Sequence, residues 1–340
     1  MATGIVTGAP AGADMEDMPL VSMRGLTKKF SLRAGKSLRK VRFTAVKGID
    51  LDIRKGEVFG LVGESGCGKS TLAMLILRLV SASSGSVLFK GEELTGLSYR
   101  KMLPLRKDMQ VVFQDPYDSL DPRFSLEQIM AEPLAIRGGY SKSERRGMIA
   151  DMLREVGLGE ELLSRYPHQL SGGQRQRLCI ARSLILSPEF LVCDEAVASL
   201  DVSVQAQILN LLLDLKEELG LTYLFISHNL AVVKFVSDRI GVMYFGSLVE
   251  LAETEELFRN VKHPYTSALL SAVPDPDPTS TKQREILRSG VPSLMSPPGG
   301  CAFHPRCRHA DERCAREEPQ LRDTGNSHFV ACHKDVGGPA

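Results

Sequence analysis

The chain has 340 residues, 43% of them hydrophobic and 24% charged, which is the composition of an ordinary folded protein. A formal net charge of +1 gives no bulk attraction to nucleic acid or to an acidic membrane surface. No stretch approaches the ~18 apolar residues of a membrane-spanning helix, and residues 1–18 lack the basic start and apolar centre of a signal peptide. We therefore expect a cytosolic chain whose residues 1–19 form a disordered tail.

Strands and helices are expected to alternate along the rest of the chain. Residues 20 to about 60 alternate in the manner of strands, and residues from about 115 to 188 are expected to be mostly helical. The best-defined single elements, in chain order, are a strand at Glu57–Val62, a helix from Lys69 to about Val80, a helix at Glu144–Val156, a strand at Phe190–Cys193, a helix at Val204–Leu219 and a strand at Tyr223–Ile226. This order predicts an α/β core with a parallel sheet and a helical insertion. A stretch at Pro274–Pro278 has the composition of a linker.

A run of basic residues crosses the strand-like N-terminal part of the chain, at Arg33, Lys36, Arg39, Lys40, Arg42 and Lys47. Charge runs usually face water, so a solvated hairpin is the first interpretation. Contact with nucleotide or lipid phosphates is the alternative, and the sequence leaves both open.

A glycine-rich segment between the strand at Glu57–Val62 and the helix after it matches the pattern G-x-x-x-x-G-K-[ST]. Glycines let backbone N–H groups close around phosphate oxygens, and the following helix points its N-terminus at the anion. We expect Lys69 to reach the β- and γ-phosphates of ATP and Ser70 to ligate Mg²⁺. The nucleotide-binding residues predicted here are Gly63, Glu64, Ser65, Gly66, Cys67, Gly68, Lys69, Ser70 and Thr71.

The strand at Phe190–Cys193 is followed by two acidic residues, Asp194 and Glu195. A phosphate loop requires a carboxylate of this kind, and we expect Asp194 to hold Mg²⁺, usually through water. Glu195 is placed to polarise an attacking water as a general base. The alternative, in which two acids merely end a strand, is weak once the phosphate loop is granted.

A third motif lies between these two, at Leu170, Ser171, Gly172, Gly173 and Gln174. The order and spacing of the three motifs make residues 20 to about 260 resemble the ATP-binding subunits of ABC transporters. The resemblance implies a P-loop NTPase core with an N-terminal antiparallel β subdomain and a helical subdomain at about 115–188. It also implies a head-to-tail dimer, in which this loop caps the γ-phosphate held by the other subunit's phosphate loop.

The resemblance assigns roles to further positions. Gln114 matches the glutamine that senses Mg²⁺ and the attacking water, at the surface that touches the membrane subunits. Ser199 and Asp201 match the loop that crosses the dimer interface. His228 matches the histidine that contacts the γ-phosphate, and Phe30 is the candidate aromatic that stacks on adenine. A purely structural role is the alternative for both His228 and Phe30.

The chain departs from the family pattern at two places. After Glu195 it reads Ala196–Val197–Ala198 where many members have Pro-Thr-Ser, and His228 is followed by Asn229 where Asp is usual. Neither departure replaces a catalytic group. We therefore expect an active ATPase and not a degenerate or purely regulatory subunit.

Residues 261–340 resemble the C-terminal extension of dipeptide and oligopeptide importer ATPases, through Lys262–Leu270 and Gly300–Cys307. Within that group the chain is most similar to the second ATPase of the permease pair. The resemblance implies a subunit at the cytoplasmic face of the bacterial inner membrane. Its partners would be two polytopic membrane permease subunits, a paralogous ATPase or a second copy of this chain, and indirectly an external solute-binding protein. Peptides are the implied solute, although relatives with this tail carry nickel, glutathione or opine-like solutes.

Four cysteines in this extension, Cys301, Cys307, Cys314 and Cys332, are spaced C-x5-C-x6-C-x17-C. Four thiolates can bind a [4Fe–4S] cluster or tetrahedral zinc, and some relatives are understood to carry an iron–sulfur cluster here. We expect metal binding, with iron–sulfur ahead of zinc. The alternative is a group of reduced thiols or labile disulfides.

The sequence therefore predicts an ATPase whose nucleotide-driven closure powers an importer. The rival interpretation is a soluble ABC-type ATPase that acts on nucleic acid or ribosomes. Such chains usually carry two of these domains or large insertions, and the near-neutral charge lacks the basic footprint of a nucleic-acid partner.

Overall fold

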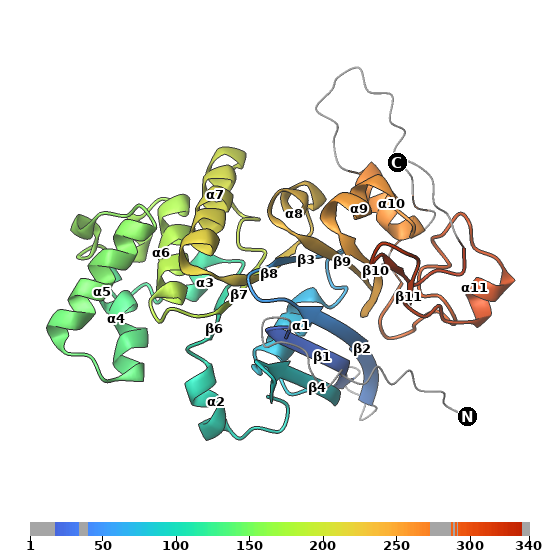
Figure 1. The fold of residues 1–340 in the computed structure, drawn as a ribbon, viewed down its shortest axis with the longest axis horizontal. Helices are drawn as coiled ribbons and strands as arrows, with labels where there is room; N and C mark the ends of the chain where they lie inside the picture. Colours follow the sequence, from blue (N-terminus) through green and yellow to red (C-terminus); the bar gives the residue numbers. More distant parts are fainter. Residues whose placement is uncertain (1–17, 34–39, 273–286, 288–289, 291, 335–340) are drawn as a thin grey trace, which may run out of the picture.

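The computed structural model describes residues 18–33, 40–272, 287, 290 and 292–334. Residues 1–17 of the predicted tail, Lys36 and Arg39 of the basic run, and the predicted linker at Pro274–Pro278 lie outside this part of the chain. The molecule is elongated, with helices α4 (Leu126–Arg137), α5 (Lys142–Glu155) and α6 (Gly172–Leu184) at one end and α11 (Glu312–Arg316) at the other. The sheets lie between them (Figure 1).

The central sheet confirms the predicted α/β core. Its order is β11-β12-β10-β9-β3-β8-β7-β6. Strands β6, β7, β8, β3 and β9 are parallel neighbours, and β10, β12 and β11 add an antiparallel edge. The strands are β3 Val58–Val62, β6 Met109–Val112, β7 Phe190–Asp194, β8 Thr222–Ser227, β9 Arg239–Tyr244, β10 Ser247–Glu253, β11 Arg322–Asp323 and β12 Phe329–Val330.

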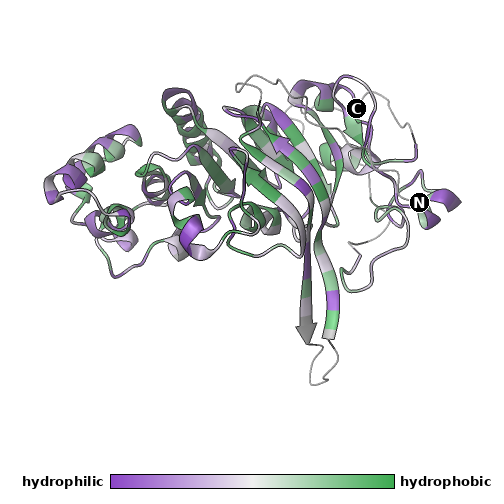
Figure 2. Ribbon diagram, turned by 60° about the horizontal axis from the view of Figure 1, so that its bottom comes forward, coloured by the Kyte–Doolittle hydropathy of each residue, from purple (hydrophilic) through white to green (hydrophobic). Residues whose placement is uncertain are grey.

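A second, antiparallel sheet has the order β2-β1-β4-β5, as the resemblance implied. Its strands are β1 Val21–Arg33, β2 Lys40–Ile53, β4 Ser84–Phe89 and β5 Glu92–Glu93. Hydrophobic and hydrophilic residues alternate along its strands, so one face is apolar (Figure 2). That face packs on helix α1 Lys69–Ile76, which lies between the two sheets and contributes Leu72 and Ile76 to the shared core.

Helices cover the rest of the central sheet and build the helical subdomain. They are α2 Tyr99–Leu105, α3 Pro116–Ser119, α4 Leu126–Arg137, α5 Lys142–Glu155, α6 Gly172–Leu184, α7 Val202–Leu219, α8 Leu230–Val236, α9 Thr254–Arg259, α10 Pro264–Ser271 and α11 Glu312–Arg316, with 3₁₀ turns at Glu160–Leu162 and Pro167–Gln169. In the described part of the chain, none of these helices has the length and apolar character needed to cross a membrane.

Capping residues explain where several helices begin. The side chains of Ser125, Ser141 and Ser171 each accept a hydrogen bond from the backbone N–H three residues further on. The Gln or Glu side chain at that third residue accepts a hydrogen bond from the backbone N–H of the serine, which completes a capping box. The predicted helix from Lys69 ends earlier than expected, at Ile76 and not near Val80. Arg78 takes a left-handed conformation with φ of 53°, which turns the chain away, and Leu79 is exposed instead of facing the core.

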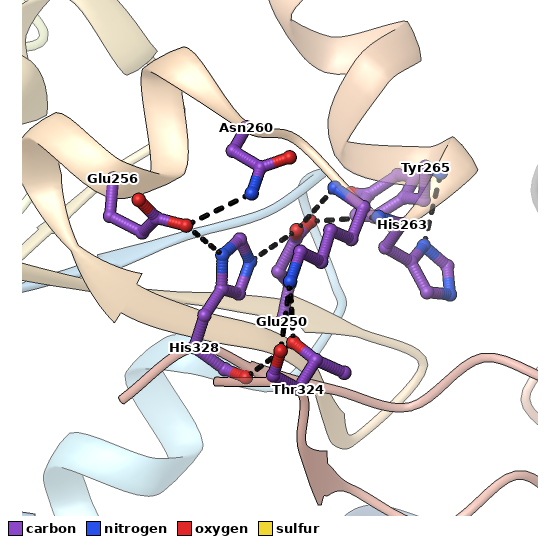
Figure 3. A network of polar contacts seen from close by, with 8 residues as sticks. Glu250, Glu256, Asn260, His263, Tyr265, Thr324 and His328 are labelled. Carbon is purple, nitrogen blue, oxygen red and sulfur yellow. Dashed lines mark hydrogen bonds and ion pairs between the residues drawn. The ribbon is translucent and has the colours of Figure 1, made fainter. Parts of the chain in front are cut away.

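The C-terminal segment joins the central sheet through a buried polar network (Figure 3). β12 pairs with β10, a contact that no pattern in the sequence predicts. His328, just before β12, is fully buried, and its Nε2 lies 2.8 Å from Oε1 of Glu250 in β10. Its Nδ1 lies 3.3 Å from Oε1 of Glu256 in α9. These contacts fix the C-terminal segment on the edge of the ATP-binding core.

Candidate nucleotide site

The phosphate loop lies between β3 and α1, as predicted, and three of its glycines have positive φ angles. The angles are 157° at Gly63, 78° at Gly66 and 110° at Gly68. A Cβ at Gly63 would lie 2.2 Å from the backbone oxygen of Met243, and one at Gly68 would lie 2.3 Å from that of Ala45. The two outer glycines are therefore required for close packing, and the loop between them is left open to an anion.

Lys69 is almost fully buried at the first position of α1. Its ammonium nitrogen donates to the backbone oxygens of Gly63, at 2.7 Å, and Glu64, at 3.1 Å. The lysine thus holds the loop closed around itself, and its charge lies where the phosphates of a nucleotide would enter.

Ser70 and Asp194 are brought together although 124 residues separate them. The Ser70 hydroxyl donates to Oδ1 of Asp194 at 3.1 Å, and Gln114 lines the same cleft of about 710 Å³. Burial raises the pKa of Asp194, and the neighbouring Glu195 adds to the effect. Hydroxyl, carboxylate and amide oxygens are the ligands that Mg²⁺ prefers, so these three residues fit the metal predicted here.

Glu195 follows Asp194 with a backbone φ of 50°, which is unusual for a residue with a side chain. Its N–H donates to the oxygen of Ile226 at 2.9 Å, which ties it to the end of β8. Oε1 of Glu195 lies 3.4 Å from Nδ1 of His228. The structure therefore places the predicted base beside the histidine that is predicted to contact the γ-phosphate. Glu195 is largely covered and His228 is more than half exposed, so the pair faces outward.

The loop from Leu170 to Gln174 lies at the start of α6, in the helical subdomain (Figure 1). Ser171 is exposed and accepts a hydrogen bond from the N–H of Gln174 at 3.2 Å. Within the described residues no hydrogen bond joins this loop to the phosphate loop. The structure therefore does not bring the two predicted phosphate-binding loops together within one chain.

Ser199 and Asp201 lie on the exposed loop before α7. Oδ1 of Asp201 accepts hydrogen bonds from the N–H of Val204, at 2.9 Å, and from the hydroxyl of Ser203, at 2.8 Å. These bonds lower the pKa of Asp201. Asp201 therefore caps α7, a structural role that its predicted place at the dimer interface did not include.

Phe30 lies on β1 directly opposite Phe43 of β2. The two rings stack with centroids 5.6 Å apart, and Nζ of Lys28 lies 5.0 Å from the Phe30 centroid. Its ring is half-buried and not part of the core. The assignment of Phe30 to adenine stacking stays a prediction.

The four C-terminal cysteines lie in one region and are free thiols. Burial raises the pKa of Cys301 to about 11, and the nearby thiols of Cys307, Cys314 and Cys332 raise it further. In the part of the chain that the structure describes, however, no three His, Cys, Asp or Glu side chains are gathered as metal ligands. The thiols are neighbours, but their present arrangement does not fit a [4Fe–4S] cluster or zinc.

Sequence reasoning missed two residues that hold the phosphate loop from the C-terminal side. The Tyr265 hydroxyl accepts a hydrogen bond from the N–H of Glu64 at 2.8 Å. The Arg306 guanidinium forms two bonds to the Glu64 carboxylate, at 2.6 and 2.8 Å. No local pattern in the sequence signals contacts across such separations.

The fold and the site define a phosphate-loop ATP-binding protein, and comparison with known proteins narrows the class. Residues 46–198 match the family model described as ABC transporter, and residues 249–314 match the one described as oligopeptide/dipeptide transporter, C-terminal region. The oligopeptide transport ATP-binding protein AppF of Bacillus subtilis is 46% identical over 318 residues, which cover 92% of this chain and 97% of AppF.

Solved structures agree with this assignment. The dimeric bacterial ABC transporter cassette MJ0796 is 30% identical, with a TM-score of 0.61 over 69% of this chain and 98% of that one. CbiO1 of Clostridium perfringens, part of the ABC transporter complex cbiONQ, is 29% identical, with a TM-score of 0.61 over 71% of this chain and 91% of its own.

The chain belongs to the ATP-binding subunits of ABC transporters, in the group with the oligopeptide/dipeptide transporter C-terminal region. It is an ATP-hydrolysing subunit of that family. Members dimerise and work with membrane permease subunits.

Proposed function

We propose that this chain powers an importer of dipeptides, oligopeptides or a related solute, as the second ATPase of the permease pair. The observation that carries the proposal is the match of residues 249–314 to the oligopeptide/dipeptide transporter C-terminal region. The name of AppF, an oligopeptide transport ATP-binding protein, supports it. The solute itself is selected by the external binding protein and the membrane subunits.

We propose a head-to-tail dimer, with a paralogous ATPase or a second copy of this chain, at the cytoplasmic face of the bacterial inner membrane. The exposure of the Ser171 loop supports this arrangement, because within the described residues no hydrogen bond joins its helix N-terminus to the phosphate loop of its own chain. Val202, beside Ser199 and Asp201, is an apolar side chain that is 83% exposed, which suits a surface that a partner covers.

In the proposed cycle, ATP closes the dimer, and each nucleotide lies between the phosphate loop of one subunit and the Ser171 loop of the other. Lys69 binds the β- and γ-phosphates, and Ser70, Gln114 and Asp194 would hold Mg²⁺. The metal, when bound, neutralises charge on the phosphate oxygens. Glu195 accepts a proton from the water as the water oxygen bonds to the γ-phosphorus. The bond from the γ-phosphorus to the β–γ bridging oxygen breaks, which releases ADP and inorganic phosphate. His228 supports the γ-phosphate.

We propose that the membrane subunits dock beside Gln114. Four large apolar side chains near it in the chain are exposed, which are Phe113, Tyr117, Phe124 and Ile136. Exposed apolar side chains in one part of a surface indicate contact with another protein. Closure of the dimer would then move the permease through the same segment that contacts Mg²⁺.

The test is a tagged pull-down from gently solubilised membranes, followed by mass spectrometry. Two polytopic membrane proteins and a second ATPase are the expected companions. Phe113→Ser should lose the membrane proteins, whereas Tyr99→Ser, which also removes an exposed aromatic ring but lies on α2, should keep them. Recovery of ribosomal or DNA-repair proteins, with the chain absent from membranes, would establish the soluble rival instead.

We also propose that the four C-terminal cysteines bind a metal centre, with [4Fe–4S] ahead of zinc, after their thiols draw together. The N–H of Cys301 donates to the backbone oxygen of Cys314 at 2.8 Å, which places these two cysteines side by side and supports the proposal. An anaerobic preparation should show visible iron–sulfur absorption and bound metal, and Cys314→Ser should lose both. Cys179→Ser, a buried thiol outside the group, is the control. A colourless, metal-free and folded protein would contradict the proposal.

A further inference from the structure

The second residue of the phosphate loop, Glu64, has contacts both within the loop and with the C-terminal region. Its carboxylate pairs with Arg306 through two hydrogen bonds, and its N–H donates to the hydroxyl of Tyr265. Its backbone oxygen accepts from the ammonium of Lys69. Glu64 therefore connects the C-terminal region directly to the lysine that is placed to bind phosphate.

Arg306 is placed by a compact aromatic cluster of Tyr244, Tyr265 and Phe303. The centroid of Tyr244 lies 4.6 Å from that of Tyr265 and 5.3 Å from that of Phe303. The Arg306 side chain is only 5% exposed, and its Cζ lies about 6 Å from the rings of Tyr244 and Phe303. A buried guanidinium needs a fixed anionic partner, and Glu64 supplies it.

Tyr265, which contacts Glu64, belongs to a larger network of polar contacts in the C-terminal region (Figure 3). Nδ1 of His263 accepts from the N–H of Tyr265 at 3.0 Å, which caps the start of α10. The N–H of His263 in turn donates to Glu250, the residue that His328 contacts. Tyr265 is thus fixed by the same network that fixes β12 on the central sheet.

We propose that Arg306 is a positioning residue for ATP binding, through which the C-terminal region shapes the phosphate loop of its own chain. Arg306 has two effects. It fixes the first half of the loop, so that the carbonyls of Gly63 and Glu64 can hold Lys69. It also neutralises a carboxylate that belongs to the loop itself and would repel the nucleotide's phosphates.

The proposal gives the C-terminal region a function in addition to any contact with other subunits. Arg306 lies in the chain directly before Cys307 and five residues after Cys301. A rearrangement of this cysteine segment would therefore reach the ATP site through one ion pair. The inference rests on ATP use by the family and does not depend on the identity of the solute.

The test is a double-mutant cycle on the purified full-length chain, read by the Kd of a fluorescent ATP analogue with Mg²⁺ and by basal phosphate release. Arg306→Met should weaken nucleotide binding and raise KM by about tenfold, as loss of a buried charge pair does, with kcat changed less than about twofold. Glu64→Gln alone should weaken binding less than Arg306→Met does, because the guanidinium that it leaves beside the loop attracts phosphate, whereas an unpaired carboxylate repels it. The double variant Glu64→Gln/Arg306→Met should bind within about threefold of the unmodified chain, because no unpaired carboxylate remains.

Two further variants keep the outcome decisive. Arg313→Met removes an exposed arginine that pairs with Glu317 on α11 in the same region, and it should leave Kd unchanged. Tyr265→Phe keeps the aromatic ring but removes the acceptor for the Glu64 N–H, and it should weaken binding about threefold even if Arg306→Met fails to fold.

An unchanged Kd in folded Arg306→Met, or a double variant as weak as Arg306→Met alone, would overturn the proposal. If Arg306→Met does not fold, an unchanged Kd in Tyr265→Phe would overturn it. Because the assay measures ATP binding by the isolated chain, failure to capture permease subunits would leave its result untouched.

Discussion

The phosphate loop and the Ser171 loop, which we propose to bind the same ATP from two subunits, differ in what surrounds them. The phosphate loop is embedded: Lys69 is buried, Ser70 contacts Asp194, and Glu64 is held from the C-terminal side. The Ser171 loop is exposed, and its bonds are those of its own helix cap. Within the described residues, the phosphate loop is thus held from several sides, whereas the hydrogen bonds of the Ser171 loop stay within its own segment of the chain.

This difference supports the proposed dimer. In that arrangement, the N–H groups at the start of α6 attract an anion that is bound by the phosphate loop of the other subunit. The residues that bind nucleotide can therefore be tested in the isolated chain, whereas the residues that complete the site act in the dimer.

The largest expected effect is on the rate of hydrolysis, from a change beside the phosphate loop that leaves ATP binding intact. Glu195→Gln keeps the shape of the side chain but cannot accept a proton, so turnover should fall by about 10²-fold or more. The ATP analogue should bind as before, because the phosphate loop is intact. Single-turnover phosphate release measures the rate of hydrolysis, and fluorescence titration measures binding of the ATP analogue. Unchanged turnover would remove Glu195 from the role of base.

A smaller effect is expected when binding itself is broken. Lys69→Ala removes the ammonium group that faces the phosphates and should weaken ATP binding by at least about tenfold, the usual scale for a charge-assisted bond. Lys107→Ala, an exposed lysine beside Asp108, is the matched control and should bind normally. Normal affinity in Lys69→Ala would count against the phosphate-loop assignment.

A third change compares two adjacent glycines in the Ser171 loop. A Cβ at Gly173 would lie 2.7 Å from Cγ1 of Val204 on α7, whereas one at Gly172 would meet nothing closer than 3.7 Å. Gly173→Ala should therefore lower the free energy of unfolding by about 1–2 kcal/mol through overpacking. Gly172→Ala should leave stability within about 0.5 kcal/mol, as urea titration would show. Equal stabilities would mean that the Ser171 loop is not held against α7 as described.

The smallest effect uses two carboxylates with opposite shifts. Burial raises the pKa of Asp194, so the folded protein holds a proton there more tightly than the unfolded chain, and the charged form destabilises the fold near neutral pH. Asp194→Asn should raise Tm by about 2 °C at neutral pH. The gain should shrink as the pH falls toward the raised pKa.

Asp201, on the exposed loop before α7, supplies a control for which the change in Tm should have the opposite sign. Hydrogen bonds lower the pKa of Asp201, so its charge stabilises the fold above the ordinary pKa of an aspartate, and this stabilisation is lost as the pH falls. Asp201→Asn should therefore lower Tm near neutral pH. Calorimetry at two pH values checks both variants, and shifts of the same sign in both would contradict the assignment.

Sequence reasoning succeeded where the physical cause is local. The phosphate loop is contiguous, so its glycines and Lys69 announce a strand, turn and helix in order. Helix α7 ends at Leu219 as predicted, because Gly220 after it adopts the left-handed conformation that the C-cap requires. Ser70 and Asp194 could be paired from the sequence only because the two motifs are known to belong to one site.

Contacts between distant segments could not be predicted in the same way. Glu64 and Arg306 are 242 residues apart, and neither position is unusual in its local sequence. The pairing of β12 with β10 depends on a buried histidine between two glutamates, which no periodicity reveals. The early end of α1 at Ile76 also lacks a glycine or proline to mark it.

The left-handed backbone of Glu195 has a consequence for the history of such chains. A residue with a side chain costs about 1–3 kcal/mol in this conformation, while glycine adopts it freely. Stability alone would therefore favour replacement of this glutamate, and the proposed role of Glu195 as the base would oppose that replacement. In gene copies released from the need to turn over ATP, we expect glycine or asparagine at this position before the fold itself begins to decay.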